Sequence, residues 1–260
     1  MKFGSLFSGI GGIDLGLERA GMTCIWQSEI EPYACQVLAK HWPDIPNLGD
    51  IRDIDWTTVD RADVVAGGYP CQPFSHAGAR RGEDDPRHLW PMFAECLRMV
   101  RPKYALLENV SGHLGLGFGS VQGDLAEIGY DTQWDCIPAA ALGAPHLRDR
   151  IFVIATRRTS MDTDSESQPR QPKHGSTRAW PSPMAYADRT GLQGRRHERT
   201  ATDRGSENRR FWEPEPSVGR VANGIPRRMD RLRGLGNAVV PQVAEYIGNI
   251  IMEADNDCSV

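Results

Sequence analysis

The feature that most constrains the fold is a regular alternation of strand-like and helix-like segments along residues 1–156. Short apolar runs alternate with stretches that carry apolar residues on one helical face. This order of strand, crossover helix and strand is typical of a doubly wound α/β sheet. We therefore expect a Rossmann-like sheet with strands at 2–7, 23–28, 63–66, 104–108, 132–137 and 150–155, and helices after residue 12, from Pro32 and over 91–100.

The periodic pattern stops after Thr156. Residues 157–226 are rich in Arg, Ser, Thr, Pro, Gly and Asp and show no sustained periodicity, so a small irregular lobe and a segment without stable structure are both open interpretations. The chain of 260 residues is long enough for one α/β domain and a small second lobe. We expect a main domain over 1–156, the lobe over 157–226, and a C-terminal segment, 227–260, that returns to the main domain. That segment resumes a helical pattern through Val239, Val243, Ile247 and Ile251.

The net charge of −4 conceals an uneven distribution of charge. Residues 157–233 hold 17 Lys and Arg against 10 Asp and Glu, whereas the rest of the chain holds 13 against 24. Arginine suits contacts with phosphates and guanine edges, so nucleic-acid binding is one interpretation, and a solvated face or linker is the other. No run approaches the roughly 20 apolar residues of a membrane span, and the N-terminus lacks the features of a signal peptide. We expect a cytoplasmic protein that does not bind membranes.

The six cysteines, at positions 24, 35, 71, 96, 136 and 258, form no CxxC pair and no zinc-like spacing with histidine. We therefore expect no bound metal and thiols that stay reduced. Most such cysteines are small buried hydrophobes. Cys71 differs, because Pro70 and Pro73 restrict the backbone around it.

A glycine-rich turn, FSGIGG at residues 7–12, closes the first expected strand and opens the first helix. Glycines there let backbone N–H groups approach a ligand, and the helix N-terminus carries partial positive charge. Glu29, at the end of the second strand, is placed to accept hydrogen bonds from ribose hydroxyls. These two features favour a nucleotide-like cofactor. A nicotinamide or flavin, or a tight turn that binds nothing, stays open.

Two more motifs follow apolar strands. GGYPCQPFS, at 67–75, places Cys71 on a stiff loop at the carboxyl end of a strand, where α/β sheets bind ligands. ENV, at 108–110, places a carboxylate at the end of the strand YALL, where it is a candidate acid. The alternatives are a proline-rich connector with an incidental cysteine and a solvated strand-end glutamate.

Together, FSGIGG, PCQPFS, ENV, the R-x-R of LRDR and GNAVVP follow the order of the sequence blocks of cytosine C5-specific DNA methyltransferases. The chain resembles the bacterial or phage members of this family over about residues 3–156 and 233–252. The resemblance implies methylation of C5 in a flipped-out cytosine, with Cys71 as the nucleophile that adds to C6. It also implies that Glu108 acts at N3, that Arg148 steadies the base, and that three residues contact the substrate: Ser75, Asn109 and Arg150.

The same resemblance implies S-adenosyl-L-methionine as the methyl donor. The residues that match the family's donor site are Phe7, Gly9, Gly11, Gly12, Glu29, Asp50, Ile51, Asn237 and Val239. Residues 75–88 match the loop that closes over DNA. Residues 157–226 occupy the place of the family's target-recognition lobe.

The implied partner is double-stranded DNA, bound by a monomer in a restriction-modification or phage context, with a cognate restriction endonuclease as a candidate partner. His146 stands where the family usually has Gln, a departure that affects only fine details. The arginine-rich block before GNAVVP is short, and this leaves the mode of DNA reading open. Two alternatives remain: an RNA (tRNA) cytosine C5 methyltransferase, and a non-catalytic nucleic-acid-binding relative. The intact set of Cys71, Glu108 and Arg148 argues against the second.

Overall fold

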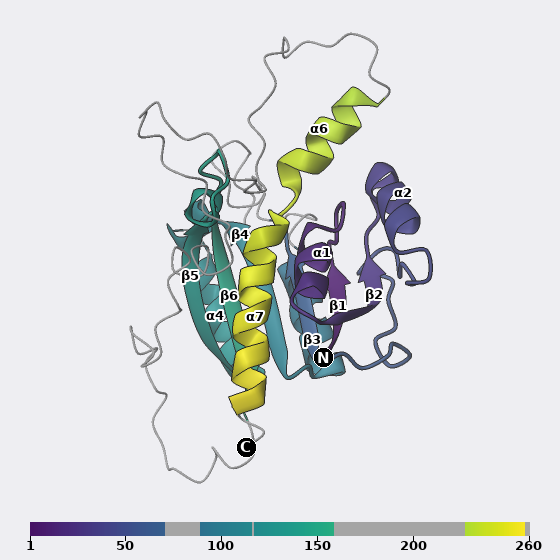
Figure 1. Ribbon diagram of the computed structural model, residues 1–260. Helices are drawn as coiled ribbons and strands as arrows, with labels where there is room; N and C mark the ends of the chain where they lie inside the picture. The colour runs from purple at the N-terminus through teal and green to yellow at the C-terminus, as the bar shows by residue number, and fades with distance from the viewer. Residues whose placement is uncertain (71–88, 116, 159–226, 258–260) are drawn as a thin grey trace, which may run out of the picture.

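The computed structural model of the protein describes residues 1–70, 89–115, 117–158 and 227–257. These residues form a six-stranded sheet flanked by helices (Figure 1). The order across the sheet is β2-β1-β3-β4-β6-β5, and β6 runs antiparallel to both of its neighbours, whereas the β1, β2, β3 and β4 pairs are parallel. The strands are β1 (Lys2–Leu6), β2 (Thr23–Ser28), β3 (Val64–Gly68), β4 (Tyr104–Val110), β5 (Tyr130–Pro138) and β6 (Asp149–Arg157).

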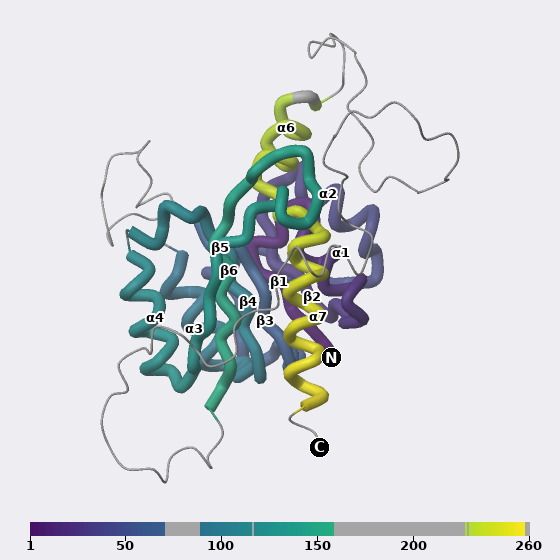
Figure 2. The backbone as a smooth tube through the Cα atoms, turned by 60° about the vertical axis from the view of Figure 1, so that its left-hand side comes forward, coloured from purple at the N-terminus to yellow at the C-terminus, as the bar shows by residue number. Residues whose placement is uncertain are grey.

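Helices cover both faces of this sheet. In Figures 1 and 2, α1 and α7 lie along one face, while α3 and α4 lie on the other. The helices are α1 (Gly12–Arg19), α2 (Pro32–His41), α3 (Trp90–Val100), α4 (Phe118–Glu127), α6 (Arg228–Asn237) and α7 (Pro241–Asp257), with short 3₁₀ turns η3 (Ser111–Gly115) and η4 (Ala139–Leu142).

Each face of the sheet has its own apolar core. Phe3 packs with Leu17 of α1 and Val243 of α7, whereas Leu6 packs with Phe93 of α3 and residues of α4. Side chains alternate between the two faces of a strand, so one short strand supplies both cores. The two cores fix β1 in the middle of the molecule, with its carboxyl end at the glycine turn.

The Rossmann-like sheet predicted from the sequence is confirmed, with three differences. β6 is antiparallel, and the helices α4 and α6 were not predicted. The expectation of one helical run through Val239 is wrong, because α6 ends at Asn237 and α7 begins at Pro241. Ala238, which follows α6, is extended, with φ −63° and ψ 142°, and the chain becomes helical again at Pro241, a residue that suits the first position of a helix.

The C-terminal segment packs on the main domain through α7, which lies against α1. Lys103 and Asp255 form an ion pair that ties the end of α7 to the start of β4. The proposed lobe, 157–226, lies outside the described residues except for its first two positions, so the three-part division stays a prediction. No helix in the described ranges is long and apolar enough to cross a membrane.

Candidate active site

Five motifs predicted from the sequence meet at one edge of the sheet. The glycine turn follows β1, Glu29 follows β2, Tyr69 follows β3, and Glu108 lies near the end of β4. Because β6 is antiparallel, its first residues lie at the same edge, and Arg150 pairs with Val110 in the ladder. Parallel strands present their carboxyl ends together, which is where ligands bind in such sheets. The sheet topology therefore brings the described residues of the candidate donor motifs and of the candidate catalytic motifs side by side.

The glycine turn adopts a backbone that glycine favours. Phe7, Gly9 and Gly11 have φ values of 53°, 57° and 82°. Gly12, which opens α1, lies so close to the chain at Val239 that an added Cβ would come within 2.3 Å of the Val239 carbonyl oxygen. The GNAVVP block is thus packed directly on the glycine turn, and Val239 is buried there.

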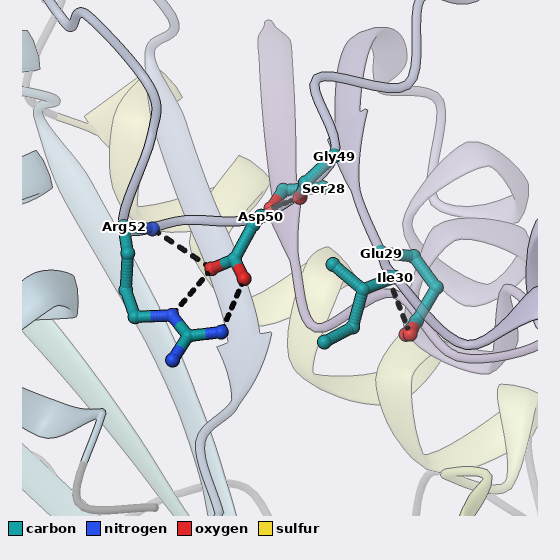
Figure 3. A network of polar contacts seen from close by, with 6 residues as sticks. All are labelled: Ser28, Glu29, Ile30, Gly49, Asp50 and Arg52. Atoms are coloured by element: carbon teal, nitrogen blue, oxygen red, sulfur yellow. Dashed lines mark hydrogen bonds and ion pairs between the residues drawn. The ribbon is translucent and has the colours of Figure 1, made fainter. Parts of the chain in front are cut away.

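Glu29 is held by backbone N–H groups on both sides. Its Oε2 accepts from the Gly9 N–H at 2.7 Å, and its Oε1 accepts from the N–H groups of Ile30 and Glu31, each at 2.8 Å. Figure 3 shows the contact with Ile30. A carboxylate has about four acceptor sites, so about one remains for a ribose hydroxyl. The contact with Gly9 joins the second strand to the glycine turn.

The segment around Asp50 lies beside the end of β2. Ser28 Oγ donates to the Gly49 carbonyl at 2.7 Å, which fixes the segment to the end of β2 (Figure 3). Asp50 accepts hydrogen bonds from Arg52, with Nε to Oδ1 at 2.9 Å, and these bonds hold the pKa of Asp50 below its usual value. Ile51 is buried in the core beside Asp50. Asp50 is therefore kept charged near Glu29.

Glu108 has a very different environment. Its side chain is buried, with Oε1 3.1 Å from Arg150 Nε. Burial raises the pKa of Glu108 to about 7, and this effect outweighs the opposing influence of Arg150 and Arg148. The Glu108 side chain fits there because residue 68 of β3 is glycine: a Cβ at Gly68 would lie 2.5 Å from Glu108 Oε2. A carboxyl group with a pKa near neutral can give and take a proton, as a general acid must.

Arg148 links the R-x-R pair to the GNAVVP block. Its Nη2 donates to the Gly236 carbonyl at 2.8 Å and to the Ala238 carbonyl. Arg148 has a φ of 36°, in the left-handed region. Partial burial lowers the pKa of its guanidinium. The two carbonyls flank Asn237, which is exposed, so Arg148 fixes the backbone of that block in this structure.

Cys71 and Ser75 lie outside the described residues. The chain just before them is held at Tyr69, because Asn109 Nδ2 donates to the Tyr69 carbonyl at 3.2 Å. The Tyr69 hydroxyl is hydrogen-bonded to His113 Nε2 at 2.9 Å, and its ring packs against Trp90. Asn109 therefore supports the chain two residues before the candidate nucleophile.

Tyr69 and His113 were not singled out from the sequence. The tyrosine directly before the Pro-Cys step was an available signal, but nothing in the sequence paired it with a histidine 44 positions later. No group of His, Cys, Asp and Glu in the described part of the chain has the arrangement of a metal site.

Comparison with known proteins agrees with this geometry. The family model for the C-5 cytosine-specific DNA methylases matches residues 1–214. The chain therefore belongs to the C-5 cytosine-specific DNA methylase family.

Curated relatives are type II methyltransferases. M.NgoMIV of Neisseria gonorrhoeae is 40% identical over 164 residues, which cover 60% of this chain and 53% of that protein. M.Eco47II of Escherichia coli is 35% identical over 165 residues, covering 60% of this chain and 40% of that protein. The chain thus spans about half or less of the length of these relatives.

Solved structures share the fold. A DNA modification methyltransferase encoded within an E. coli prophage has a TM-score of 0.52 and 27% identity, covering 60% of this chain and 47% of that chain. The S. pombe Dnmt2 methyltransferase has a TM-score of 0.53 and 21% identity, covering 65% and 57%, and supports the fold alone.

Proposed function

We propose that the protein is a DNA (cytosine-5-)-methyltransferase that uses S-adenosyl-L-methionine. The observation that carries this proposal is the position of Glu108: a buried carboxyl with a pKa of about 7, beside Arg150, at the same sheet edge as the glycine turn. Family membership supports the reaction class. Because the matched relatives are longer, the activity of the whole protein stays part of the proposal.

The glycine turn, Glu29 and Asp50, here called the donor edge, fit S-adenosyl-L-methionine. Glu29 retains about one acceptor site for a ribose hydroxyl, and Gly9 leaves open space for a ligand, since an added Cβ there would meet only the Phe7 carbonyl oxygen, at 4.0 Å. Asp50 supplies a second carboxylate, and Val239 closes the apolar side. When bound, this donor supplies an electrophilic methyl group on a positively charged sulfur.

The proposed reaction begins when the Cys71 thiolate bonds to C6 of cytosine. Glu108 gives its proton to N3 as negative charge develops on the ring, and Arg150 stabilises the carboxylate that remains. C5 is then nucleophilic and takes the methyl group, whose former bond to sulfur breaks. A base removes the C5 proton, the bond between Cys71 and C6 breaks to restore the thiolate, and N3 returns its proton to Glu108.

We propose double-stranded DNA as the substrate, modified in the cytoplasm by a monomer in a restriction-modification or phage context. The family of DNA methylases supports DNA as the substrate, the type II methyltransferase relatives support the restriction-modification context, and a cognate endonuclease belongs to the same proposal. The experiment is bisulfite sequencing of genomic DNA and of tRNA from a host that expresses the chain, with a Cys71→Ser host as the control. Methylcytosine at a recurring DNA sequence supports the proposal, whereas methylation confined to tRNA would overturn the choice of substrate.

We further propose that residues 157–226 form a reduced target-recognition lobe. Their excess of arginine suits phosphate contacts and a few base contacts, so a recognition site of about two to four base pairs is expected, at roughly 1–3 kcal/mol per base contact. Replacing residues 160–220 with a Gly/Ser linker tests this role. Methylation that persists at the same sites with the same salt dependence would place the specificity elsewhere.

A further inference from the structure

A buried carboxylate lies beneath the glycine turn and takes no part in the proposed reaction. Asp14, in the first turn of α1, is fully buried. Its Oδ2 accepts from Ser5 Oγ of β1 at 3.0 Å, and its Oδ1 accepts from Gln27 Nε2 of β2 at 2.7 Å. An apolar residue would fill this site without the cost of removing a carboxyl group from water. The two hydrogen bonds join β1, β2 and α1 at one point.

The network continues from Asp14 into the glycine turn. Ser8 Oγ lies 2.9 Å from Ser5 Oγ and 3.2 Å from the Ser5 carbonyl, so the Ser8 hydroxyl donates toward Ser5. The Ser8 backbone is fixed as well, because its N–H donates to the Ser28 carbonyl at 3.2 Å and its carbonyl accepts from the Gly11 N–H at 2.9 Å. Ser8 is thus held at its side chain, its N–H and its carbonyl.

The neighbours of Ser8 are two residues of the candidate donor site. Phe7 and Gly9 both have left-handed backbones, which is a strained conformation for Phe7. Such a conformation persists where the surroundings determine it fully. The chain of contacts from Asp14 through Ser5 to Ser8 supplies one such restraint, and the contact of Gly9 with Glu29 supplies another on the opposite side.

We infer that Asp14 is a positioning residue for the methyl donor, which it serves by holding Ser8, and through Ser8 the donor-binding backbone of Phe7 and Gly9. This role rests on the proposed function, since it assumes that the glycine turn binds S-adenosyl-L-methionine. Asp14 itself lies beneath the turn and acts only through the hydroxyls of Ser5 and Ser8.

Because the Ser5 and Ser8 hydroxyls can both donate and accept, Asp14→Asn and Asp14→Ala should affect the network differently. Asp14→Asn keeps an acceptor for Gln27 and turns an N–H₂ toward Ser5, whose hydroxyl can rotate to accept it and donate to Ser8. The Ser8 hydroxyl then donates to the Ser5 carbonyl, so every partner is satisfied in the reversed direction. Asp14→Ala removes both acceptors and breaks the chain. Ser8→Ala leaves Asp14 intact and breaks only its link to the glycine turn.

The test compares these variants with a control that loses a buried hydroxyl far from the site. Tyr130→Phe is matched, because the Tyr130 hydroxyl is buried and donates to the Pro102 carbonyl at 2.8 Å, at the opposite edge of the sheet. For each protein, calorimetry gives the Kd of S-adenosyl-L-methionine, thermal unfolding gives Tm, and turnover on DNA gives kcat at saturating donor. Hydrogen exchange of the amides of residues 7–12 is measured without any ligand.

We expect Asp14→Ala and Ser8→Ala to raise the Kd by about 10-fold and to speed amide exchange in residues 7–12, while kcat stays within about 2-fold. Asp14→Asn should stay within about 3-fold of the wild-type Kd, and Tyr130→Phe should leave the Kd unchanged even where Tm falls. If Asp14→Ala does not fold, Ser8→Ala decides the matter.

Three results would overturn the inference. Wild-type affinity in Ser8→Ala would remove the positioning role, and so would a loss of affinity that follows Tm equally in Tyr130→Phe. If the wild-type protein itself binds no S-adenosyl-L-methionine, the proposed function fails and this role fails with it. In the first two cases the wild type still binds the donor, so the proposed function survives.

Discussion

The carboxylates on the two sides of the site lie in opposite environments. The donor edge holds the glycine turn, Glu29 and Asp50, and the catalytic edge holds Glu108 and Arg150. On the donor edge, Asp50 is partly exposed and hydrogen-bonded to Arg52, which keeps its pKa low. On the catalytic edge, Glu108 is buried beside Arg150, and its pKa rises to about 7. The difference lies in desolvation, because both carboxylates have an arginine partner. In the proposed reaction, the carboxylate that only accepts hydrogen bonds stays charged, and the carboxyl group that exchanges a proton has a pKa close to neutral pH.

The same contrast extends to the backbone around each group. Glu29 accepts three backbone N–H groups, which fix it to the glycine turn and to the start of α2. Glu108 has room only because Gly68 faces it across the β3–β4 pair. On the donor edge, backbone hydrogen bonds therefore fix the Glu29 carboxylate. On the catalytic edge, the absence of a side chain at Gly68 leaves the space that Glu108 occupies.

The largest expected effect on the catalytic edge comes from Cys71→Ser, which should abolish turnover. A hydroxyl is far less ionised than a thiol at neutral pH, so it cannot add to C6. The measurement is transfer of labelled methyl groups to DNA, with donor binding by calorimetry as the control that should not change. The wild type should also form a denaturation-resistant adduct with DNA containing 5-fluorocytosine. An active enzyme that forms no such adduct would contradict the covalent mechanism.

Glu108→Gln should lower the rate by about 10²–10⁴-fold while leaving the Kd of the donor unchanged. The amide still hydrogen-bonds to N3, but it has no acidic proton to give. Single-turnover kinetics with saturating DNA and donor isolate the chemical step. Near-normal turnover would remove Glu108 from the reaction and with it the contrast between the two edges.

The raised pKa of Glu108 also has a consequence for stability. The unfolded chain releases this proton near pH 4.5, while the folded protein keeps it up to about pH 7. Glu108 therefore makes its full contribution to the stability of the folded protein below about pH 4.5, and this contribution is lost as the pH rises through about 7. The free energy of unfolding of the wild type should fall relative to Glu108→Gln by on the order of 3 kcal/mol across this window.

Denaturant unfolding at closely spaced pH values measures this difference. Asp14 has the same sign, because burial raises its pKa to about 6, and it is present in both proteins, so its effect cancels. A difference between the two proteins that does not change with pH would mean that Glu108 is charged in the folded state.

Much of the fold followed from local sequence patterns, because the strands and first helices are marked by apolar periodicity. The direction of β6 depends on contacts between distant segments, which such patterns do not encode. The break at Ala238–Val240 has a local signal in Pro241, since proline begins a helix more readily than it continues one. The glycine turn, Glu29 and ENV could be found because each lies at the carboxyl end of a strand or directly after it.

Partners at long sequence separation were not found from the sequence. Ser5 and Gln27 are unremarkable polar residues in strands until the fold places Asp14 between them. Arg148 was expected to act on the base, whereas its contacts here are with the carbonyls of Gly236 and Ala238, and that bridge spans about 90 residues. The role of Arg148 toward the base stays a prediction.

The smallest expected effect concerns the donor edge alone. Glu29→Ala removes the acceptor for ribose hydroxyls and for the Gly9 N–H, so it should raise the Kd of S-adenosyl-L-methionine by about 10-fold or more and leave DNA affinity unchanged. Glu31→Ala is the matched control. Glu31 is a neighbouring carboxylate that accepts the Ala34 N–H at 2.9 Å as the N-cap of α2, so its loss should lower Tm without changing donor affinity. Calorimetry with the donor and fluorescence anisotropy with DNA give the two affinities separately. Equal losses of both affinities in Glu29→Ala would mean that the two edges do not act independently, whereas a loss of donor affinity in Glu31→Ala would show that α2, and not the Glu29 carboxylate, sets the donor site.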